Sequence, residues 1–297
     1  MKLFAPKYYN GFTCISDRCT HSCCIGWEID IDHTSAKRYA SLSGGYGEII
    51  KNSIEWEDTP HFRLSSDERC PHLDKNGLCR IILELGEDHL CDICREHPRF
   101  YNYSAKGKEV GLGLCCEEAA RIILSSDDYD KLVEIGKTNE AEEDVEYDST
   151  PAREWIFSVL SSDMEYREKL YAIYHEYDVS PSILTDAEWR EIIASLEYLD
   201  EAHREMFACY SNGAVVPSSE EKATARALAY FVYRHCTEVY DDDDLRAYLG
   251  FCLFCERLLA SLIAHNGTDD IVTLARIVSE EIEYSEDNTE TIVMRFE

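Results

Sequence analysis

The spacing of apolar side chains divides the chain into two parts near residue 150. Beyond that point apolar residues recur at helical intervals. Thr185-Asp186-Ala187-Glu188 places a capping threonine three residues before a glutamate, which predicts the start of one helix. The other segments predicted to be helical are 155–160, 170–174, the stretch from Ser219 to Val232, the stretch from Asp241 to Leu262, and Ile271–Ile282. A short strand is predicted at Thr291–Phe296.

Shorter patterns fill the first 150 residues. Trp27, Ile29 and Ile31 alternate with acidic residues, which predicts a strand with one buried face. Asn76-Gly77 is a turn signal that lets the chain double back, so that Cys70 and Cys79 face one site. Further elements predicted here are a helix over 34–53 broken at Ser43-Gly44-Gly45, a strand at 61–64, helical turns between Leu83 and Arg95 that end before Pro98, and a helix at 117–124.

These patterns predict a mainly α protein. A cysteine-rich metal-binding domain with short strands would span residues 1–136, and an α-helical bundle would span 151–297. The residues between them, 137–150, are acidic and lack periodicity, so we interpret them as a linker. A solvated loop within a single domain is the alternative.

The net charge of −30 is concentrated in the second part of the chain. Residues 1–120 carry 14 Lys+Arg and 19 Asp+Glu, whereas the remainder carries 15 and 40. Such a surface repels phosphate backbones, so we expect no nucleic-acid partner. It would attract a basic, lysine-bearing protein, although solubility alone also accounts for an acidic surface.

No targeting or membrane segment is expected from the sequence. The first nine residues lack the apolar run of a signal peptide, and no stretch of about 18 consecutive apolar residues occurs. We therefore expect a cytoplasmic location without membrane association. Thiols are kept reduced in that compartment, so clustered cysteines indicate metal or redox sites rather than disulfides.

Ten of the 14 cysteines precede residue 120. Thiolates favour zinc or iron–sulfur clusters. Only Cys91-x-x-Cys94 has the tight spacing of structural zinc sites, whereas the varied spacing of the rest suits a 4Fe–4S cluster. The Cys-x3-Cys-x2-Cys signature of radical S-adenosylmethionine enzymes fails, because Gly26 stands where its third cysteine would fall.

Gly111-Leu112-Gly113 is too short a match for a nucleotide-binding loop. Cys252-x-x-Cys255 lies in an apolar helical stretch with Cys236 and His235 nearby in sequence. It indicates either a second metal site or buried cysteines that pack as small hydrophobic residues.

Five fragments occur in an order that carries a family resemblance. They are Cys14-x4-Cys19-x3-Cys23-Cys24-x-Gly-Trp-x-Ile-x-Ile-Asp32, Cys70-Pro71-x-Leu73, Leu78-Cys79-Arg80-Ile81 followed by Leu85-Gly86-Glu87, Cys94-x3-Pro98-Arg99, and Cys116-x-Glu118-Ala119-Ala120-Arg121. In this order, over roughly residues 10–125, the chain resembles the flagellin lysine N-methylase family, part of a wider group of cysteine-rich zinc- or iron-chelating proteins.

The resemblance implies methyl transfer from S-adenosylmethionine to lysine side chains of flagellin, with a 4Fe–4S cluster and with zinc as the alternative metal. The metal ligands that it implies are Cys14, Cys19, Cys23, Cys24, Cys70, Cys79, Cys94 and Cys116. Cys91 and Cys115 fall outside that set. His72 stands where the family often has an aromatic residue, and it is either a ligand or a packing residue.

Two charged residues on the family pattern have competing interpretations. Asp32 is a candidate to accept the lysine proton, or it caps the turn before His33. Arg99 would contact S-adenosylmethionine, or it forms a structural ion pair. Two rival functions stay open at this point: a non-catalytic module in which zinc holds the fold, and a redox protein that uses an iron–sulfur cluster.

Overall fold

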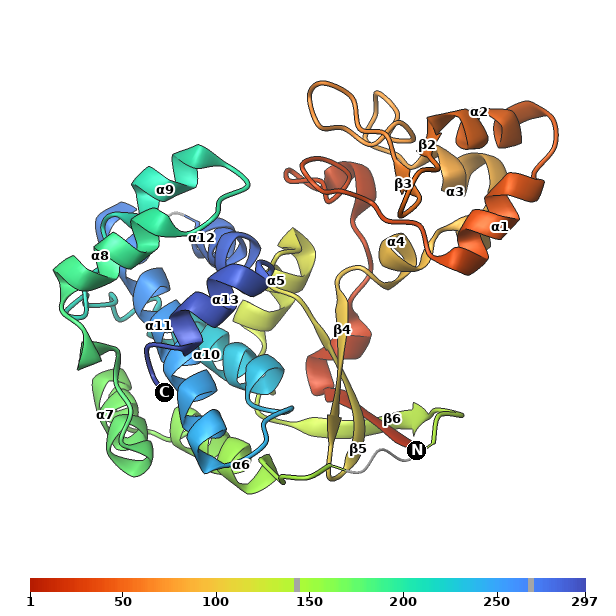
Figure 1. Cartoon of the computed structure of the whole chain (residues 1–297). Helices are drawn as coiled ribbons and strands as arrows, with labels where there is room; N and C mark the ends of the chain where they lie inside the picture. The colour runs from red at the N-terminus through yellow and green to blue at the C-terminus, as the bar shows by residue number, and fades with distance from the viewer. Residues whose placement is uncertain (142–144, 267–269) are drawn as a thin grey trace. The chain divides into compact units, whose positions relative to one another are not determined.

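The computed structural model describes residues 1–141, 145–266 and 270–297, and it divides into two compact units (Figure 1). The thiol unit comprises Thr13–Pro98, and the helical unit comprises Met1–Phe12 together with Arg99–Glu297. The thiol unit is therefore an insertion between two parts of the helical unit. About 53% of the chain is helical, which confirms the predicted mainly α class.

These units differ from the predicted domains, because a sheet that precedes residue 138 belongs to the helical unit. Its strands are β1 (Lys2–Pro6), β4 (Arg99–Ser104), β5 (Gly107–Leu112) and β6 (Leu132–Lys137), in the order β4-β5-β1-β6. β1 is parallel to β5 and antiparallel to β6, and β4 and β5 form a hairpin. The predicted linker begins where β6 ends, and residues 142–144 within it lie outside the described residues.

Close backbone approach explains one glycine of this sheet. Gly107 in the β4–β5 turn has φ +137°, and a Cβ there would lie 2.6 Å from the carbonyl oxygen of Lys2. A larger residue would push β5 away from β1. The Gly111/Gly113 pair has a similar role, since a Cβ on Gly113 would lie 2.3 Å from Tyr284 Oη. These glycines serve packing, in agreement with the interpretation that they form no nucleotide loop.

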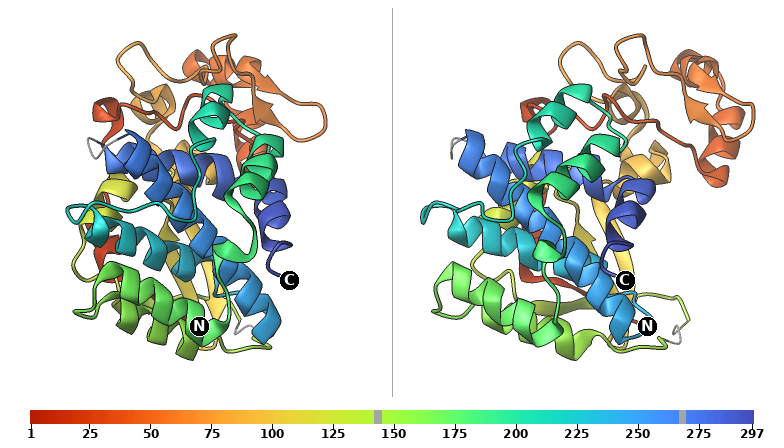
Figure 2. Two further views of the ribbon diagram at one scale, coloured as in Figure 1. Left: turned by 90° about the vertical axis from the view of Figure 1, so that its left-hand side faces the viewer. Right: turned by 60° about the vertical axis from the view of Figure 1, so that its left-hand side comes forward.

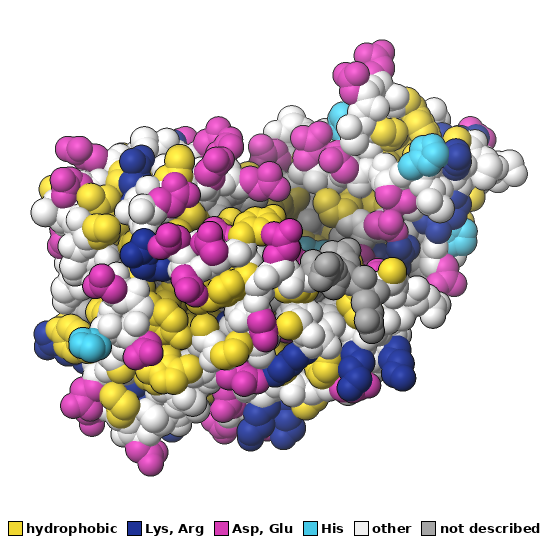
Figure 3. All heavy atoms as spheres, turned by 60° about the horizontal axis from the view of Figure 1, so that its bottom comes forward, with side chains coloured by type: hydrophobic (Ala, Val, Ile, Leu, Met, Phe, Trp, Pro, Cys, Tyr) yellow, Lys and Arg dark blue, Asp and Glu magenta, His cyan; other side chains and the backbone are white. Residues whose placement is uncertain are grey.

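Helices form the rest of the helical unit, and α11 is its central element, in contact with α10, α12 and α13 (Figure 2). The helices are α5 (Glu117–Ser125), α6 (Thr150–Leu160), α7 (Tyr166–Tyr177), α8 (Asp186–Ser195), α9 (Glu201–Phe207), α10 (Glu221–His235), α11 (Asp242–Asn266), α12 (Ile271–Val278) and α13 (Glu286–Val293). α11 is long and apolar enough to cross a membrane, with a mean hydropathy of 1.6, but 89% of that apolar window is buried within the protein, as in a core helix. Acidic side chains are spread over the face shown in Figure 3.

Most helices predicted from periodicity are present, and one predicted strand is wrong. The Thr185–Glu188 capping box opens α8 with both of its hydrogen bonds. The tail from Thr291 was predicted to form a strand, but Glu286–Val293 is helical because Ser285 caps it through the backbone N–H of Asn288. The last predicted helix continues beyond α12 as a π-helical turn, Ser279–Glu283.

The thiol unit consists of short elements around a small core. They are α1 (His33–Ser41), α2 (Gly45–Ser53), β2 (Ile54–Glu55), β3 (His61–Phe62), α3 (Arg80–Leu85) and α4 (Asp92–Glu96). The break predicted at Ser43-Gly44-Gly45 separates α1 from α2. The strand predicted at residues 27–31 is reduced to a single bridge between Asp30 and His61, although Ile29 and Ile31 are buried as the alternation predicted.

A buried ion pair joins the sheet to the helices. Arg153 of α6 donates to both carboxylate oxygens of Glu109 in β5, each at 2.8 Å, and also to Thr237 Oγ1 at 2.8 Å. Both partners are 1% exposed. Neither charge has a water shell, so each depends on the other.

Arg153→Met is expected to destabilise the protein by about 3–5 kcal/mol, because it leaves the Glu109 carboxylate buried without a counter-charge. The double variant Arg153→Met/Glu109→Leu should recover most of that loss. Urea unfolding measures the free energy of unfolding of the wild type and of each variant. Arg167→Met, on the exposed side of α7, is the control and should change stability by less than about 0.5 kcal/mol. A double variant as unstable as Arg153→Met would contradict the interpretation.

Candidate functional site

Five thiols meet in the core of the thiol unit, and we call them the five-thiol cluster. They are Cys24, Cys70, Cys79, Cys91 and Cys94. Two of them, Cys70 and Cys91, belong to the buried core, and the other three pack against it. These five thiols are packed in one small core, so they are neighbours of one another.

Backbone pairing brings the first three thiols together. The Cys70 N–H donates to the Cys24 carbonyl at 2.8 Å, and Ile25 bridges to Arg69, so that these two segments run side by side. The turn at Asn76-Gly77, with φ +80° at Gly77, returns the chain so that Cys79 bridges to Leu73. The predicted convergence of Cys70 and Cys79 is therefore present.

α4 supplies the other two thiols. Cys91 is its N-cap residue and Cys94 lies in its first turn, three residues on, which places both on one side of the helix. Their thiols share a hydrogen bond, which lowers the pKa of Cys91 and raises the pKa of Cys94. Cys91 was outside the ligand set that the resemblance implied, and its C-x-x-C spacing was the signal for it.

Ionisation of all five thiols together would need a neutralising cation. Burial raises the pKa of Cys70 to about 12, and the neighbouring thiolates of Cys24, Cys79 and Cys91 also raise it. A hydrogen bond from Cys23 is the main cause that lowers the pKa of Cys24 to about 7, with Ser22 and Arg69 contributing. Several buried thiolates repel each other unless a metal neutralises them. This donor set, sulfur alone, fits zinc or an iron–sulfur cluster.

The other cysteines of the implied ligand set, Cys14, Cys19, Cys23 and Cys116, are not members of the five-thiol cluster. Cys23 contacts Cys24 through its thiol. Cys14 is exposed, and the Cys19 thiol donates to the His21 carbonyl at 3.0 Å. Cys116 is the N-cap residue of α5, in the helical unit. The structure thus brings together four of the eight implied ligands, and Cys91 joins them.

His72 has both ring nitrogens occupied by protein partners. Nδ1 lies 2.7 Å from Tyr46 Oη, and Nε2 lies 2.9 Å from Ser53 Oγ. The side chain is fully buried, which, with the nearby Arg80, lowers its pKa to about 4. It is therefore a neutral core residue that packs against Phe62, and the structure favours packing over metal ligation.

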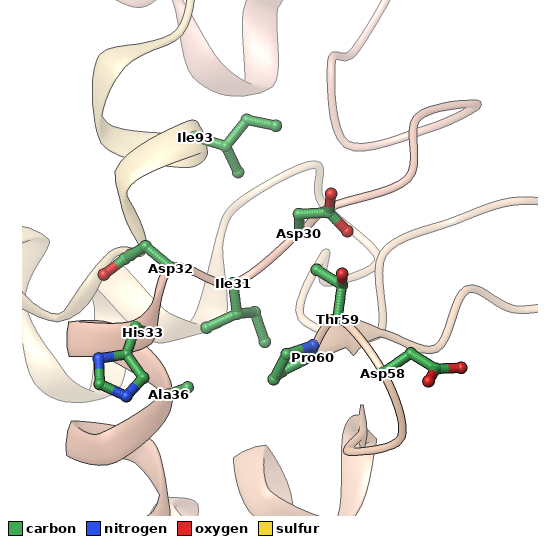
Figure 4. Close-up of a pocket in the computed structure, with 9 residues that line it drawn as sticks. All are labelled: Asp30, Ile31, Asp32, His33, Ala36, Asp58, Thr59, Pro60 and Ile93. Carbon is green, nitrogen blue, oxygen red and sulfur yellow. The ribbon is translucent and has the colours of Figure 1, made fainter.

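An acidic pocket opens next to α4 (Figure 4). Its volume is about 500 Å³, and its lining residues are Asp30, Ile31, Asp32, His33, Ala36, Asp58, Thr59, Pro60 and Ile93. Ile93 stands between the two thiols of α4 in the sequence. Asp30 also belongs to a group with Glu28 and His61 whose ligand atoms lie within 4.8 Å of one another. Three carboxylates, those of Asp30, Asp32 and Asp58, carry negative charge in an otherwise largely apolar lining, so the pocket suits a ligand with a cationic group and an aliphatic part.

Asp32 is engaged as a cap. One carboxylate oxygen accepts from the Ser35 N–H at 2.9 Å, and the other accepts from the Asp92 N–H at 3.0 Å. Burial would raise its pKa, but these hydrogen bonds outweigh it and lower the pKa to about 2. A carboxylate of this pKa is a weak base at neutral pH. The geometry supports the capping interpretation, and Asp32 ties α1 to the start of α4.

Arg99 contacts aromatic residues of the helical unit. Its Nε donates to Tyr9 Oη at 2.9 Å, and its guanidinium lies 5.7 Å from the Phe12 ring centre.

In the helical unit, the sulfur atoms of Cys236 and Cys252 lie 3.8 Å apart, and both residues are fully buried together with Cys255. Burial raises the pKa of Cys252 and Cys255, as expected of cysteines that pack in an apolar core.

His72 should make stability depend on pH in a definite direction. Because its folded pKa, about 4, lies below the ordinary 6.5, the folded state binds this proton less well. Stability is then complete above pH 6.5 and falls as the pH drops towards 4, by about 2 kcal/mol between pH 6.5 and 5. His72→Gln should remove this slope in urea unfolding, whereas His175→Gln, exposed on α7, should keep it. Equal slopes for both variants would contradict the prediction.

Three curated proteins are similar to part of this chain. Over 133 residues, 41% of this chain, it is 29% identical to the flagellar biosynthetic protein FliU of Salmonella muenchen, of which it covers 77%. Over an equal length it is 30% identical to the lysine-N-methylases of Salmonella typhimurium and Salmonella choleraesuis, and covers 32% of each. No family model and no solved structure matches the chain. It thus spans about a third of those lysine-N-methylases, and over that part its resemblance to the flagellin lysine N-methylase family is confirmed.

Proposed function

We propose that the protein is an S-adenosylmethionine-dependent N-methyltransferase that acts on lysine side chains of flagellin or of another lysine-bearing protein, and that the five-thiol cluster holds a 4Fe–4S cluster. The observation that carries this proposal is the convergence of the five thiols beside an acidic pocket, in a chain related to lysine-N-methylases. Zinc is the alternative metal for the same thiols.

The donor set has the number and kind of ligands that a cluster needs. Four thiolates bind one 4Fe–4S cluster, and the residues that would hold it are among Cys24, Cys70, Cys79, Cys91 and Cys94. When bound, an iron–sulfur cluster supplies positive charge that neutralises the thiolates, and one-electron chemistry. The acidic pocket adjoins α4, so the cluster ligands on that helix also support the pocket wall that carries Ile93.

The acidic pocket has groups suited to a lysine side chain. Asp30 and Asp58 would hold the ammonium, and Ile93 would contact its aliphatic part. The reaction needs the neutral amine, whose nitrogen forms a bond to the donor's methyl carbon as the carbon–sulfur bond breaks and the sulfonium becomes a thioether. One proton must leave the nitrogen on the way.

His61 is the group that we propose takes this proton. Its backbone pairs with that of Asp30, which places it beside the pocket. Its Nδ1 lies 2.9 Å from the Thr59 carbonyl, so the neutral ring donates there and leaves Nε2 to accept a proton. The Glu28 carboxylate, 3.8 Å from Nδ1, would stabilise the imidazolium that forms.

The double variant Cys70→Ser/Cys91→Ser should abolish iron and sulfide binding, because it leaves only three sulfurs of the five-thiol cluster, one fewer than a 4Fe–4S cluster needs. The measurement is iron, sulfide and zinc analysis, with the absorption near 400 nm, on protein purified without oxygen. Cys209→Ser, in the helical unit, should keep wild-type metal content. Zinc in place of iron, without methyl transfer, would identify a module in which metal only holds the fold. A cluster that passes electrons without methyl transfer would identify a redox protein.

His61→Gln should lower methyl transfer at least about 100-fold while the iron content is unchanged, because only the proton acceptor is lost. Transfer of labelled methyl from S-adenosylmethionine to flagellin lysines measures this. His175→Gln on α7 should retain transfer within about twofold. Activity of His61→Gln equal to that of the control would remove His61 from the mechanism.

A further inference from the structure

A second pocket lies in the helical unit, away from any residue used so far. Its volume is about 630 Å³. The lining residues come from α6, from the end of α7, from the start of α11 and from the segment before α6: Tyr147, Asp148, Pro151, Ala152, Trp155, Glu176, Tyr177, Asp242, Asp243, Leu245 and Arg246. Three aromatic rings and four carboxylates therefore face one cavity.

Two of the aromatic rings, those of Trp155 and Tyr177, contact each other edge to face. The Trp155 and Tyr177 ring centres are 5.7 Å apart and their planes make an angle of 70°. Tyr177 is tied to α6 through its hydroxyl, which donates to the Ala152 carbonyl at 3.4 Å, and Tyr147 donates to Asp242 at 2.5 Å. All three rings pack against the buried core of the helical unit, so they are held in place before any ligand arrives.

The charge of this pocket selects a cation. Asp148, Glu176, Asp242 and Asp243 line it against a single guanidinium, that of Arg246, which already pairs with Asp243 at 3.1 Å. Aromatic faces attract alkylammonium groups, and nearby carboxylates add to that attraction. An anionic ligand would meet uncompensated negative charge.

We propose that this aromatic–acidic pocket binds the alkylammonium end of a lysine side chain, unmodified or methylated, on a basic segment of a partner protein. The ammonium would lie against Trp155 and Tyr177, and the aliphatic stem would contact Pro151 and Ala152. This inference goes beyond the proposed function, because it concerns a separate binding site and requires no methyl transfer. The acidic character of the second part of the chain, 15 Lys+Arg against 40 Asp+Glu after residue 120, fits such a partner.

Titration calorimetry of the full chain with three short peptides tests the proposal. The peptides carry lysine, trimethyl-lysine, or a neutral isostere in which carbon replaces the trimethylated nitrogen. Both charged peptides should bind, and the neutral isostere should bind at least about tenfold more weakly, because it has the shape without the charge. Equal binding of the neutral isostere would overturn the proposal.

Matched variants assign the binding to this pocket. Tyr177→Leu and the surface change Glu176→Lys should each weaken binding of the trimethyl-lysine peptide at least about tenfold. Tyr171→Leu, an exposed tyrosine on the same helix, should leave it within about twofold. Asp58→Asn removes a carboxylate that we propose for the substrate lysine in the thiol unit, so it should weaken binding of the trimethyl-lysine peptide far less than Glu176→Lys does. Loss of binding in Asp58→Asn with retention in Glu176→Lys would place the lysine site in the thiol unit and overturn this inference. Methyl transfer is not the readout, so failure of the proposed function would leave this result intact.

Discussion

The convergence of sulfur in the core of residues 13–98 is the constraint on which the thiol unit depends. Its helices are short, its two-residue strands contribute little pairing, and long connections lie between them. Cys70 and Cys91 fill core positions that larger apolar side chains would otherwise occupy. If the proposed metal binds those thiols, a unit of this size with so little regular structure would gain much of its stability from that metal, as small metal-binding domains do.

The insertion of this unit explains the arrangement of the sheet. β1 enters the helical unit at the start of the chain, and its parallel partner β5 arrives more than 90 residues later, after the whole thiol unit. Parallel strands need a long crossover, and here the inserted unit is that crossover. The ion pair between Arg153 and Glu109 then ties β5 to α6, so the sheet and the helices form one body.

Two pockets of the described residues share a preference for positive charge, and each lies within a single unit. The pocket of the thiol unit combines carboxylates with a neighbouring histidine, which suits proton removal from an amine. The pocket of the helical unit combines carboxylates with aromatic rings, which suits binding without chemistry. The lysine-bearing protein partner that we propose would account for both.

The sequence alone determined the features that depend on near neighbours in the chain. Helical periodicity after residue 150, the capping box at Thr185 and the turn at Asn76-Gly77 each arise from residues a few positions apart, so their local chemistry was enough to predict them. The family resemblance could also be identified from the sequence, because it depends on the order of the cysteine motifs along the chain.

Only the tertiary structure decided the sheet and the membership of the thiol cluster. β5 contains Lys108 and Glu109, both buried, and no strand was predicted there, because these polar residues are neutralised by partners distant in the sequence. Cys91 joined the cluster and Cys116 was placed in the other unit for the same reason. Contacts between segments far apart in the chain are set by the folded backbone, and no pattern within a single segment records them.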